Sequence, residues 1–183
     1  MMFYRLLKNQ NVTRTESFND MNGDEWYAEA VYALSSLGII QGYSDGSFRG
    51  NNSITRAAFT AIATRFAKSN ATVSHDSYGD AFTDVPETHW ARDTIARASS
   101  YGWVGGYADG SFHPADSITR AAVTAIINRM LGRNADEAYV TAHGNELNQF
   151  SDVQNPDAWY YYNVAEAANE HSFARRGEKE VWD

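Results

Sequence analysis

Two arginines in the chain, Arg56 and Arg120, have the residue type and the setting to bind an anion. Each stands in an Ile-Thr-Arg-Ala stretch whose threonine is suited to cap a helix, so each guanidinium group is expected at a helix start. A cation at that end of a helix dipole is unfavourable without an anionic partner. A guanidinium group can hold a carboxylate through two parallel hydrogen bonds. The sequence therefore predicts that both arginines bind an anionic ligand, with a structural ion pair as the alternative.

A loop with the pattern Gly-Tyr-x-Asp-Gly-Ser-Phe precedes each arginine, at residues 42–48 and 106–112. The central Tyr-x-Asp-Gly is typical of a turn, because Asp can hydrogen-bond its own backbone and Gly can adopt positive φ. Glycines also let backbone donors approach a ligand that a Cβ atom would push away. The candidate ligand-binding residues of the loops are Gly42, Tyr43, Asp45, Gly46 and Ser47 in the first, and Gly106, Tyr107, Asp109, Gly110 and Ser111 in the second.

The loop and the arginine belong to a unit that occurs twice with a constant displacement along the chain. Such a fixed displacement indicates a duplicated supersecondary unit. After each arginine, apolar residues recur at helical spacing and predict the second helix of each unit. A shorter pattern, Phe-x-Asp followed by Trp, precedes both loops and occurs a third time near the C-terminal end; its members are Phe18, Asp20 and Trp26, then Phe82, Asp84 and Trp90, then Phe150, Asp152 and Trp159.

Each of these tryptophans opens an apolar stripe at helical period, which predicts the first helix of each unit. Because they lie on that stripe, the tryptophans are expected to be core anchors rather than platforms for a sugar ring. The aspartates just upstream are expected to cap the free N–H groups of the same helices. Gly38 and Gly102 are expected to end the first two of them.

The two ends of the chain fit the same pattern as half units. Residues 1–8 match the end of a second helix, and the last 34 residues, 150–183, contain a first helix without its loop. Helices this short are marginal alone in water. The two half units are therefore expected to pack together, with Leu6 near Val164, and to close a third prong.

Composition excludes several classes of function. The net charge of −8 argues against generic nucleic-acid binding, which needs a basic surface. The absence of cysteine rules out disulfides and thiolate metal sites. No apolar run is long enough to cross a bilayer, so membrane insertion is not expected, and the start of the chain does not resemble a signal peptide. The five histidines lack metal-ligand spacing, so no metal site is expected and each is expected at the surface.

An enzyme is not expected either. Residues 42–46 match the G-x-S-x-G motif of serine hydrolases, but that motif needs a preceding strand, and a helix and a glycine precede it here. The second copy of the loop has Ala108 where the first has Ser44, so the would-be nucleophile is not part of the repeated pattern.

Taken together, Phe-x-Asp-Val, Trp, Gly-Tyr-x-Asp-Gly-Ser-Phe and Ile-Thr-Arg-Ala closely resemble the S-layer homology (SLH) repeat. The resemblance covers residues 18–68 and 82–133, with weaker halves at 1–9 and 150–171. It implies an all-α fold of helix-loop-helix repeats in a pseudo-threefold, three-pronged arrangement. The resulting division is an end of a repeat and linker at 1–17, repeats at 18–68 and 82–133, linkers at 69–81 and 134–149, and a partial repeat and tail at 150–183.

The resemblance also implies a function. Proteins of this family attach non-covalently to secondary cell-wall polysaccharide, often pyruvylated, which would place this chain outside the cell, at a bacterial cell wall or S-layer. The ligand is expected in grooves between prongs, near the arginines and loop glycines, without a cofactor. The family's Thr-Arg-Ala-Glu is altered here, because Ala58 and Ala122 replace the glutamate and leave only half of a capping box. The alternative is therefore a protein-interaction or adhesin scaffold that has lost glycan binding.

Overall fold

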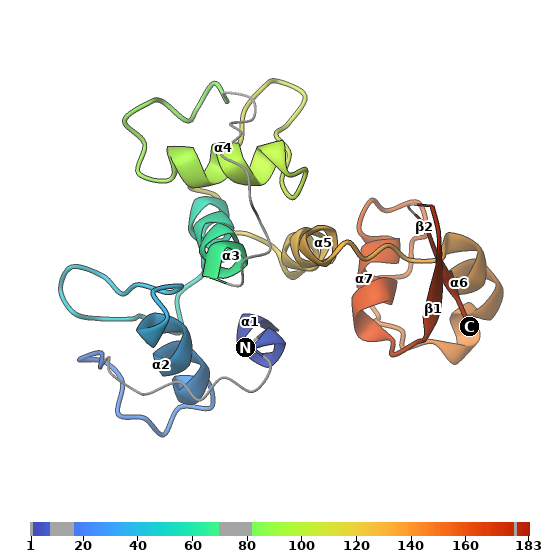
Figure 1. Ribbon diagram of the computed structural model, residues 1–183, viewed down its shortest axis with the longest axis horizontal. Coiled ribbons are helices and arrows are strands. Elements are labelled where there is room, and N and C mark those ends of the chain that lie inside the picture. Colours follow the sequence, from blue (N-terminus) through green and yellow to red (C-terminus); the bar gives the residue numbers. More distant parts are fainter. Residues whose placement is uncertain (1, 8–16, 70–81, 178) are drawn as a thin grey trace.

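The computed structural model describes residues 2–7, 17–69, 82–177 and 179–183. Helices α1, α3 and α5 lie near the centre, and α2, α4 and a C-terminal group that contains α7 extend outward from them (Figure 1). The described elements are α1 (Met2–Leu6), α2 (Ala28–Ser36), α3 (Arg56–Ser69), α4 (Arg92–Ser100), α5 (Arg120–Leu131), α6 (Glu137–His143), the 3-10 helix η1 (Gly144–Glu146), α7 (Tyr161–Ala168), β1 (Phe173–Arg176) and β2 (Lys179–Trp182). The expected helical fold is confirmed, apart from one antiparallel hairpin. The pseudo-threefold arrangement of the repeats stays a prediction.

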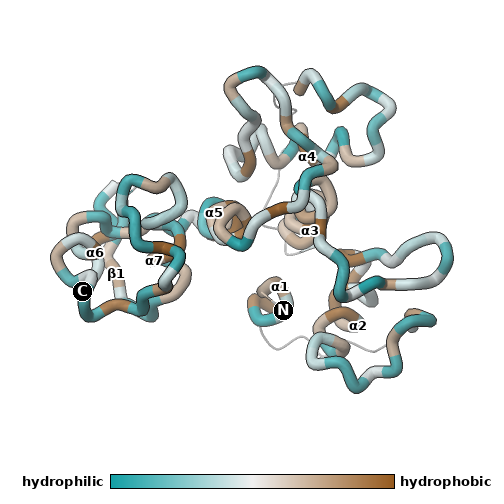
Figure 2. The backbone as a smooth tube through the Cα atoms, turned by 180° about the vertical axis from the view of Figure 1, so that it is seen from behind, coloured by the Kyte–Doolittle hydropathy of each residue, from teal (hydrophilic) through white to brown (hydrophobic). Residues whose placement is uncertain are grey.

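A single apolar core joins the first five helices. Phe3 of α1 packs against Phe59 and Phe66 of α3, with ring centroids 5.7 and 4.8 Å apart. Ile95 of α4 and Ile126 of α5 are buried in the same cluster. The loops that extend outward from α2 and α4 are largely hydrophilic (Figure 2). A second, smaller apolar cluster, which includes Phe18 and Val31, lies at α2.

The predicted starts of the second helices and the predicted glycine ends of the first helices are confirmed. Thr55 and Thr119 each accept a hydrogen bond at Oγ1 from the backbone N–H three residues on, at 3.2 Å. Helix α2 is terminated by Gly38, two residues after its last residue. The φ of Gly38 is 69°, and the N–H of Ile39 donates to the carbonyl of Leu34 at 2.9 Å. This is a Schellman motif, in which a glycine takes the left-handed conformation that other residues disfavour.

The aspartates of the Phe-x-Asp pattern do not cap the first helices, so that prediction was wrong. Asp84 accepts hydrogen bonds of 2.7 Å at both carboxylate oxygens, from the backbone N–H groups of Phe112 and His113. Asp20 makes the same pair of bonds to the loop of the first unit. In each of these two units, the aspartate therefore holds the loop that follows the first helix. It accepts hydrogen bonds from two adjacent backbone N–H groups that would otherwise lack a protein partner.

The third unit departs from the other two. Where a loop and a second helix would follow α7, the chain forms the β1–β2 hairpin, and Asp152 has no hydrogen-bond partner among the described residues. Phe150 is 42% exposed, whereas Phe18 at the same place in the first unit is buried. The segment 134–149, expected to be a linker, contains α6 and η1.

The expected pairing of the two half units was also wrong. Leu6 of α1 packs against the main core, beside α2 and α3. Val164 of α7 lines a small cavity within the C-terminal group, and α7 packs against α5 and α6. The two helices are well separated in Figure 1. Each half unit therefore packs against a different part of the chain.

A short backbone pairing joins the first two units. The N–H groups of Arg56 and Ala57 donate to the carbonyls of Asp116 and Pro114 at 2.8 and 3.1 Å. In return, the N–H of Ile118 donates to the carbonyl of Ile54 at 3.0 Å. These bonds fix the start of α3 against the segment that leads into α5.

The role of Asp84 can be tested by substitution to Asn, which keeps the shape but replaces one acceptor oxygen by an amide. We expect Asp84→Asn to lower the free energy of unfolding by about 1 kcal/mol, because a charged hydrogen bond to the loop is lost at a partly exposed site. Asp152→Asn is the matched control and should leave it unchanged. Urea unfolding of the three proteins measures both, and equal effects of the two substitutions would contradict the assignment.

The same bonds predict a dependence on pH. The N–H groups of Phe48 and then Arg49 lower the pKa of Asp20 below its ordinary value. Burial opposes the shift at Asp84, yet the N–H groups of its loop still leave its pKa lowered. Carboxylates with a lowered folded-state pKa stabilise the protein fully above their unfolded pKa, and this stabilisation is lost as the pH falls through the folded-state value. The difference in unfolding free energy between wild type and Asp84→Asn should therefore shrink as the pH falls below about 4.

Candidate ligand-binding groove

A groove of about 380 Å³ lies where the three units meet. Arg56 comes from the first unit, and Trp159 from the third. The second unit supplies the rest, namely Val104, Gly105, Gly106, Tyr107, Ser117, Ile118, Thr119, Ala122, Ala125, Ile126 and Arg129. The groove therefore depends on how successive units are joined.

Arg56 lies at the edge of this groove and is held by the next unit. Its Nε donates to the carbonyl of Phe112 at 2.9 Å, and its Nη2 donates to the carbonyl of Gly105 at 3.2 Å. The guanidinium carbon also lies 5.3 Å from the ring centroid of Tyr107. A guanidinium group has five N–H donors, so these two bonds leave three for a ligand.

Arg120 is placed differently, although it occupies the same position in its unit. Its side chain is exposed, makes no hydrogen bond or ion pair with the described residues, and does not line the groove. The reason is the missing third loop, because Arg56 is held by the loop of the following unit and Arg120 has no such loop after it. The structure thus brings Arg56, but not Arg120, to this groove.

Of the loop residues predicted to bind ligand, Gly106 and Tyr107 line the groove. Gly106 has a structural reason as well, because an added Cβ would collide with the ring of Phe82 and the carbonyl of Ser111. Gly110 has a φ of 81°, as the turn requires. Asp109 accepts from the backbone N–H and the hydroxyl of Ser111, which confirms its expected role in the turn.

The first loop repeats this geometry. Gly42 packs on the ring of Phe18, Gly46 has positive φ, and Ser47 is buried with its hydroxyl donating to Asp45. The Ser47 hydroxyl and N–H, with the Arg49 guanidinium, hold the pKa of Asp45 well below its usual range. Arg49 also covers the ring of Tyr43, at 4.1 Å from its centroid. In the second loop, His113 takes the place of Arg49 and packs on Tyr107.

The tryptophans are not core anchors, contrary to the prediction. Trp26, Trp90 and Trp159 are 79%, 63% and 61% exposed. Each precedes the first residue of its helix by two positions, so it lies outside the apolar stripe of that helix, although its spacing from the stripe residues is helical. Trp159 instead forms one wall of the groove. An exposed aromatic ring of this kind offers a flat apolar face to a ligand.

Arg129 is a further groove residue that the sequence reasoning did not include. It lies near the end of α5, is exposed, and donates from Nη1 to the carbonyl of Trp103 at 3.2 Å. Its recurrence as Arg5 and Arg65 at the same place in the second helices was the signal that could have found it. The groove therefore carries two guanidinium groups, from Arg56 and Arg129, and aromatic rings from Tyr107 and Trp159.

One histidine also departs from expectation. The side chain of His171 is only 7% exposed and lies with Glu166 and Glu180 in the C-terminal group. This cluster is separate from the groove, because none of its members lines it. His75 lies outside the described residues.

Comparison with known proteins adds the family. A family model described as "S-layer homology domain" matches residues 17–60 and 81–124. The chain is 32% identical over 168 residues to the cellulosome-anchoring protein of Acetivibrio thermocellus, covering 91% of this chain and 34% of that protein. It is 31% identical over 170 residues to cell surface glycoprotein 1 of the same organism, covering 89% of this chain and 7% of that protein.

An enzyme is among the relatives. The amylopullulanase of Thermoanaerobacterium thermosulfurigenes is 36% identical over 138 residues, which is 74% of this chain but only 7% of that protein. The chain thus spans about a third or less of the length of these curated relatives. None of the described helices is long and apolar enough to cross a membrane. On the ordered motifs, the two matched segments and these relatives, residues 17–60 and 81–124 are two repeats of the S-layer homology family.

Proposed function

We propose that this chain anchors a bacterial surface protein by binding an anionic cell-wall polysaccharide in the groove between its units. Surface attachment is supported by the family and by relatives named as anchoring and cell-surface proteins. The observation that carries the finer proposal is the groove itself, which places two guanidinium groups beside two exposed aromatic rings. On this proposal the chain acts outside the cell, as a binding module and not as a catalyst.

The chemistry of the groove suits an acidic sugar. A carboxylate such as a pyruvate ketal could accept hydrogen bonds from Arg56 and Arg129, each of which has N–H groups left over from its backbone contacts. The faces of Trp159 and Tyr107 could pack on the apolar face of a pyranose ring. Gly105 lines the groove with open space where a Cβ would stand, so a sugar can approach its backbone closely.

A protein-interaction scaffold is the second candidate. It is favoured by Arg56, whose two bonds to backbone carbonyls already give it a structural role between units. On that account the exposed tryptophans would contact a protein surface rather than a glycan. The two candidates differ in whether binding to purified wall material survives removal of its polysaccharide.

Substitutions in the groove test the leading proposal. We expect Arg129→Ala to weaken binding to pyruvylated wall oligosaccharide by ~1.5–3 kcal/mol, the usual scale for a hydrogen bond to a charged group, and Trp159→Ala to weaken it by about 1 kcal/mol or more. Arg120→Ala is the matched control, since it removes an exposed arginine of the same helix that lies outside the groove. Calorimetry measures all three.

The outcomes separate the alternatives. Loss of binding in Arg120→Ala but not in Arg129→Ala would move the anion site to the start of α5, as the sequence alone suggested. Equal affinity for pyruvylated and depyruvylated oligosaccharide would show that the groove does not bind the carboxylate of the pyruvate group. No binding of either sugar by the wild type would leave the scaffold as the better reading.

Two neighbouring glycines provide a further test. Gly105→Ala should leave the melting temperature nearly unchanged, because the added methyl group meets nothing within 4 Å, yet it should weaken sugar binding by filling the groove. Gly106→Ala should destabilise the fold, because its methyl group would collide with Phe82 and the carbonyl of Ser111. Thermal unfolding and calorimetry on both variants check this. Unaltered sugar binding by Gly105→Ala would show that the ligand does not approach the backbone at Gly105.

A further inference from the structure

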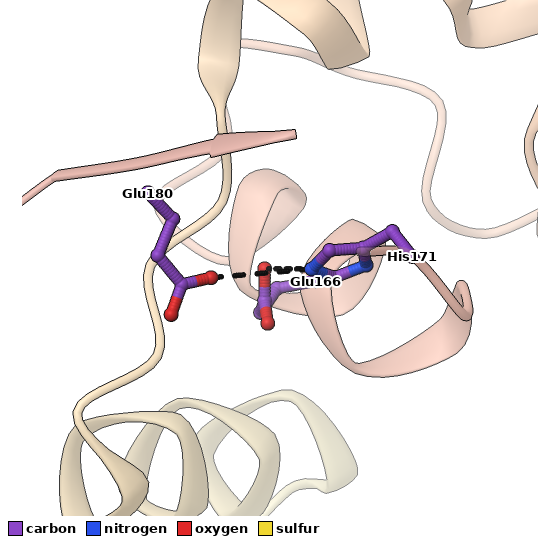
Figure 3. A group of neighbouring side chains, drawn as sticks. All are labelled: Glu166, His171 and Glu180. Carbon is purple, nitrogen blue, oxygen red and sulfur yellow. Dashed lines mark ion pairs between the residues drawn. The ribbon is translucent and has the colours of Figure 1, made fainter. Parts of the chain in front are cut away.

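Three buried side chains converge in the C-terminal group, away from the groove. Glu166 lies on α7, His171 follows that helix, and Glu180 lies on β2; all three point toward one another (Figure 3). Their side chains are only 2%, 7% and 1% exposed. Oε2 of Glu166 and Oε2 of Glu180 lie 3.5 and 3.9 Å from Nε2 of His171. One oxygen or nitrogen atom from each residue lies within 4.8 Å of the others.

The imidazole of His171 is oriented as a ligand. Its Nδ1 lies 2.9 Å from the backbone carbonyl of Asn169, and a carbonyl can only accept, so Nδ1 carries the hydrogen. In the neutral ring, Nε2 then carries the lone pair, and Nη2 of Arg133 and the two carboxylates surround it. Trp182 stacks on the ring with centroids 3.7 Å apart and holds it in this position. A backbone carbonyl on the other ring nitrogen is the usual second partner of a metal-binding histidine.

Arg133 supplies part of the positive charge that two buried carboxylates need. Its Nη2 lies 2.7 Å from Oε1 of Glu166, and its Nε lies 3.0 Å from Oε1 of Glu180. Nη2 also lies 2.8 Å from Nε2 of His171. Nε also lies 3.3 Å from Oε2 of Glu180, and Nη2 of Arg175 lies 3.7 Å from its Oε1. Oε2 of Glu166, by contrast, is buried without a hydrogen-bond partner among the described residues.

We propose that Glu166, His171 and Glu180 bind a divalent transition metal ion of the Zn²⁺ class, with water as a fourth ligand. Bonds of about 2.1 Å in a tetrahedral site place neighbouring ligand atoms about 3.4 Å apart, close to the two distances from Nε2 of His171. A mixed set of imidazole and carboxylate ligands suits Zn²⁺ better than Ca²⁺ or Mg²⁺, which take oxygen ligands.

Arg133 does not block such a site. It can keep its bonds to the Oε1 atoms of Glu166 and Glu180, and would give up its contacts with Nε2 of His171 and Oε2 of Glu180 to the metal ion. The bound ion would join α7, the turn after it and β2. It would therefore stabilise the part of the chain that replaces the loop and second helix of the other units.

The test uses the whole chain, freed of metal with a chelator and titrated with zinc chloride by calorimetry. We expect one Zn²⁺ per chain and a rise in melting temperature that saturates with it. Glu180→Gln and His171→Ala should each weaken binding at least about tenfold and abolish the metal-dependent rise. His143→Ala is the matched control and should bind as the wild type does, because His143 lies in the same group, stacked on Tyr139, outside the cluster.

The experiment distinguishes a metal site from a cluster of ion pairs that only stabilises the fold. Lower metal-free stability of the variants, with no Zn²⁺ response in the wild type, would show a structural ion cluster only and overturn the proposal. Binding that is equal in wild type and Glu180→Gln would also overturn it. If His171→Ala folds poorly, Glu180→Gln and the visible absorption spectrum of the wild type with Co²⁺ test the proposal instead. A spectrum of octahedral aqueous Co²⁺ alone would contradict the site.

Discussion

The contact between Arg56 and the following unit is the interaction on which the rest of the structure depends. The guanidinium group donates to the carbonyls of Phe112 and Gly105, while the backbone beside it pairs with residues 114–118. Phe112 is a fully buried residue, and one planar guanidinium group reaches both its carbonyl and that of the exposed Gly105. Because this contact sets the position of one unit against the next, it also forms the groove that lies between them.

Rigid loops make that contact possible. Each complete loop is held from three sides: by the aspartate of the Phe-x-Asp pattern, by its own Asp–Ser turn, and by a glycine packed on a phenylalanine ring. Most of the loop residues that look like ligand contacts are therefore occupied in shaping the loop. The surfaces left for a ligand are Tyr107, the backbone at Gly105, and side chains from neighbouring units such as Trp159.

The repeats, the helix ends and the turns could be predicted, because each depends on local chemistry that a short pattern encodes. Thr55 as a cap and Gly38 as a terminator are examples. What failed depended on partners far along the chain. Asp84 was assigned to the nearest helix but bonds to a loop 28 residues away, and Trp159 matched a helical spacing although it stands before the helix starts. The equivalence of Arg56 and Arg120 failed because only the first has a complete loop after it.

The central claim is that the groove between successive units is the binding surface. Amide NMR spectra of the labelled chain, titrated with pyruvylated oligosaccharide from the wall, test it most directly. The account predicts saturable shifts at the indole N–H of Trp159 and the backbone N–H groups of Gly105 and Gly106, with Gly144 and Gly177 in the C-terminal group unchanged. Shifts confined to that C-terminal group, or no saturable shift at the groove, would contradict it.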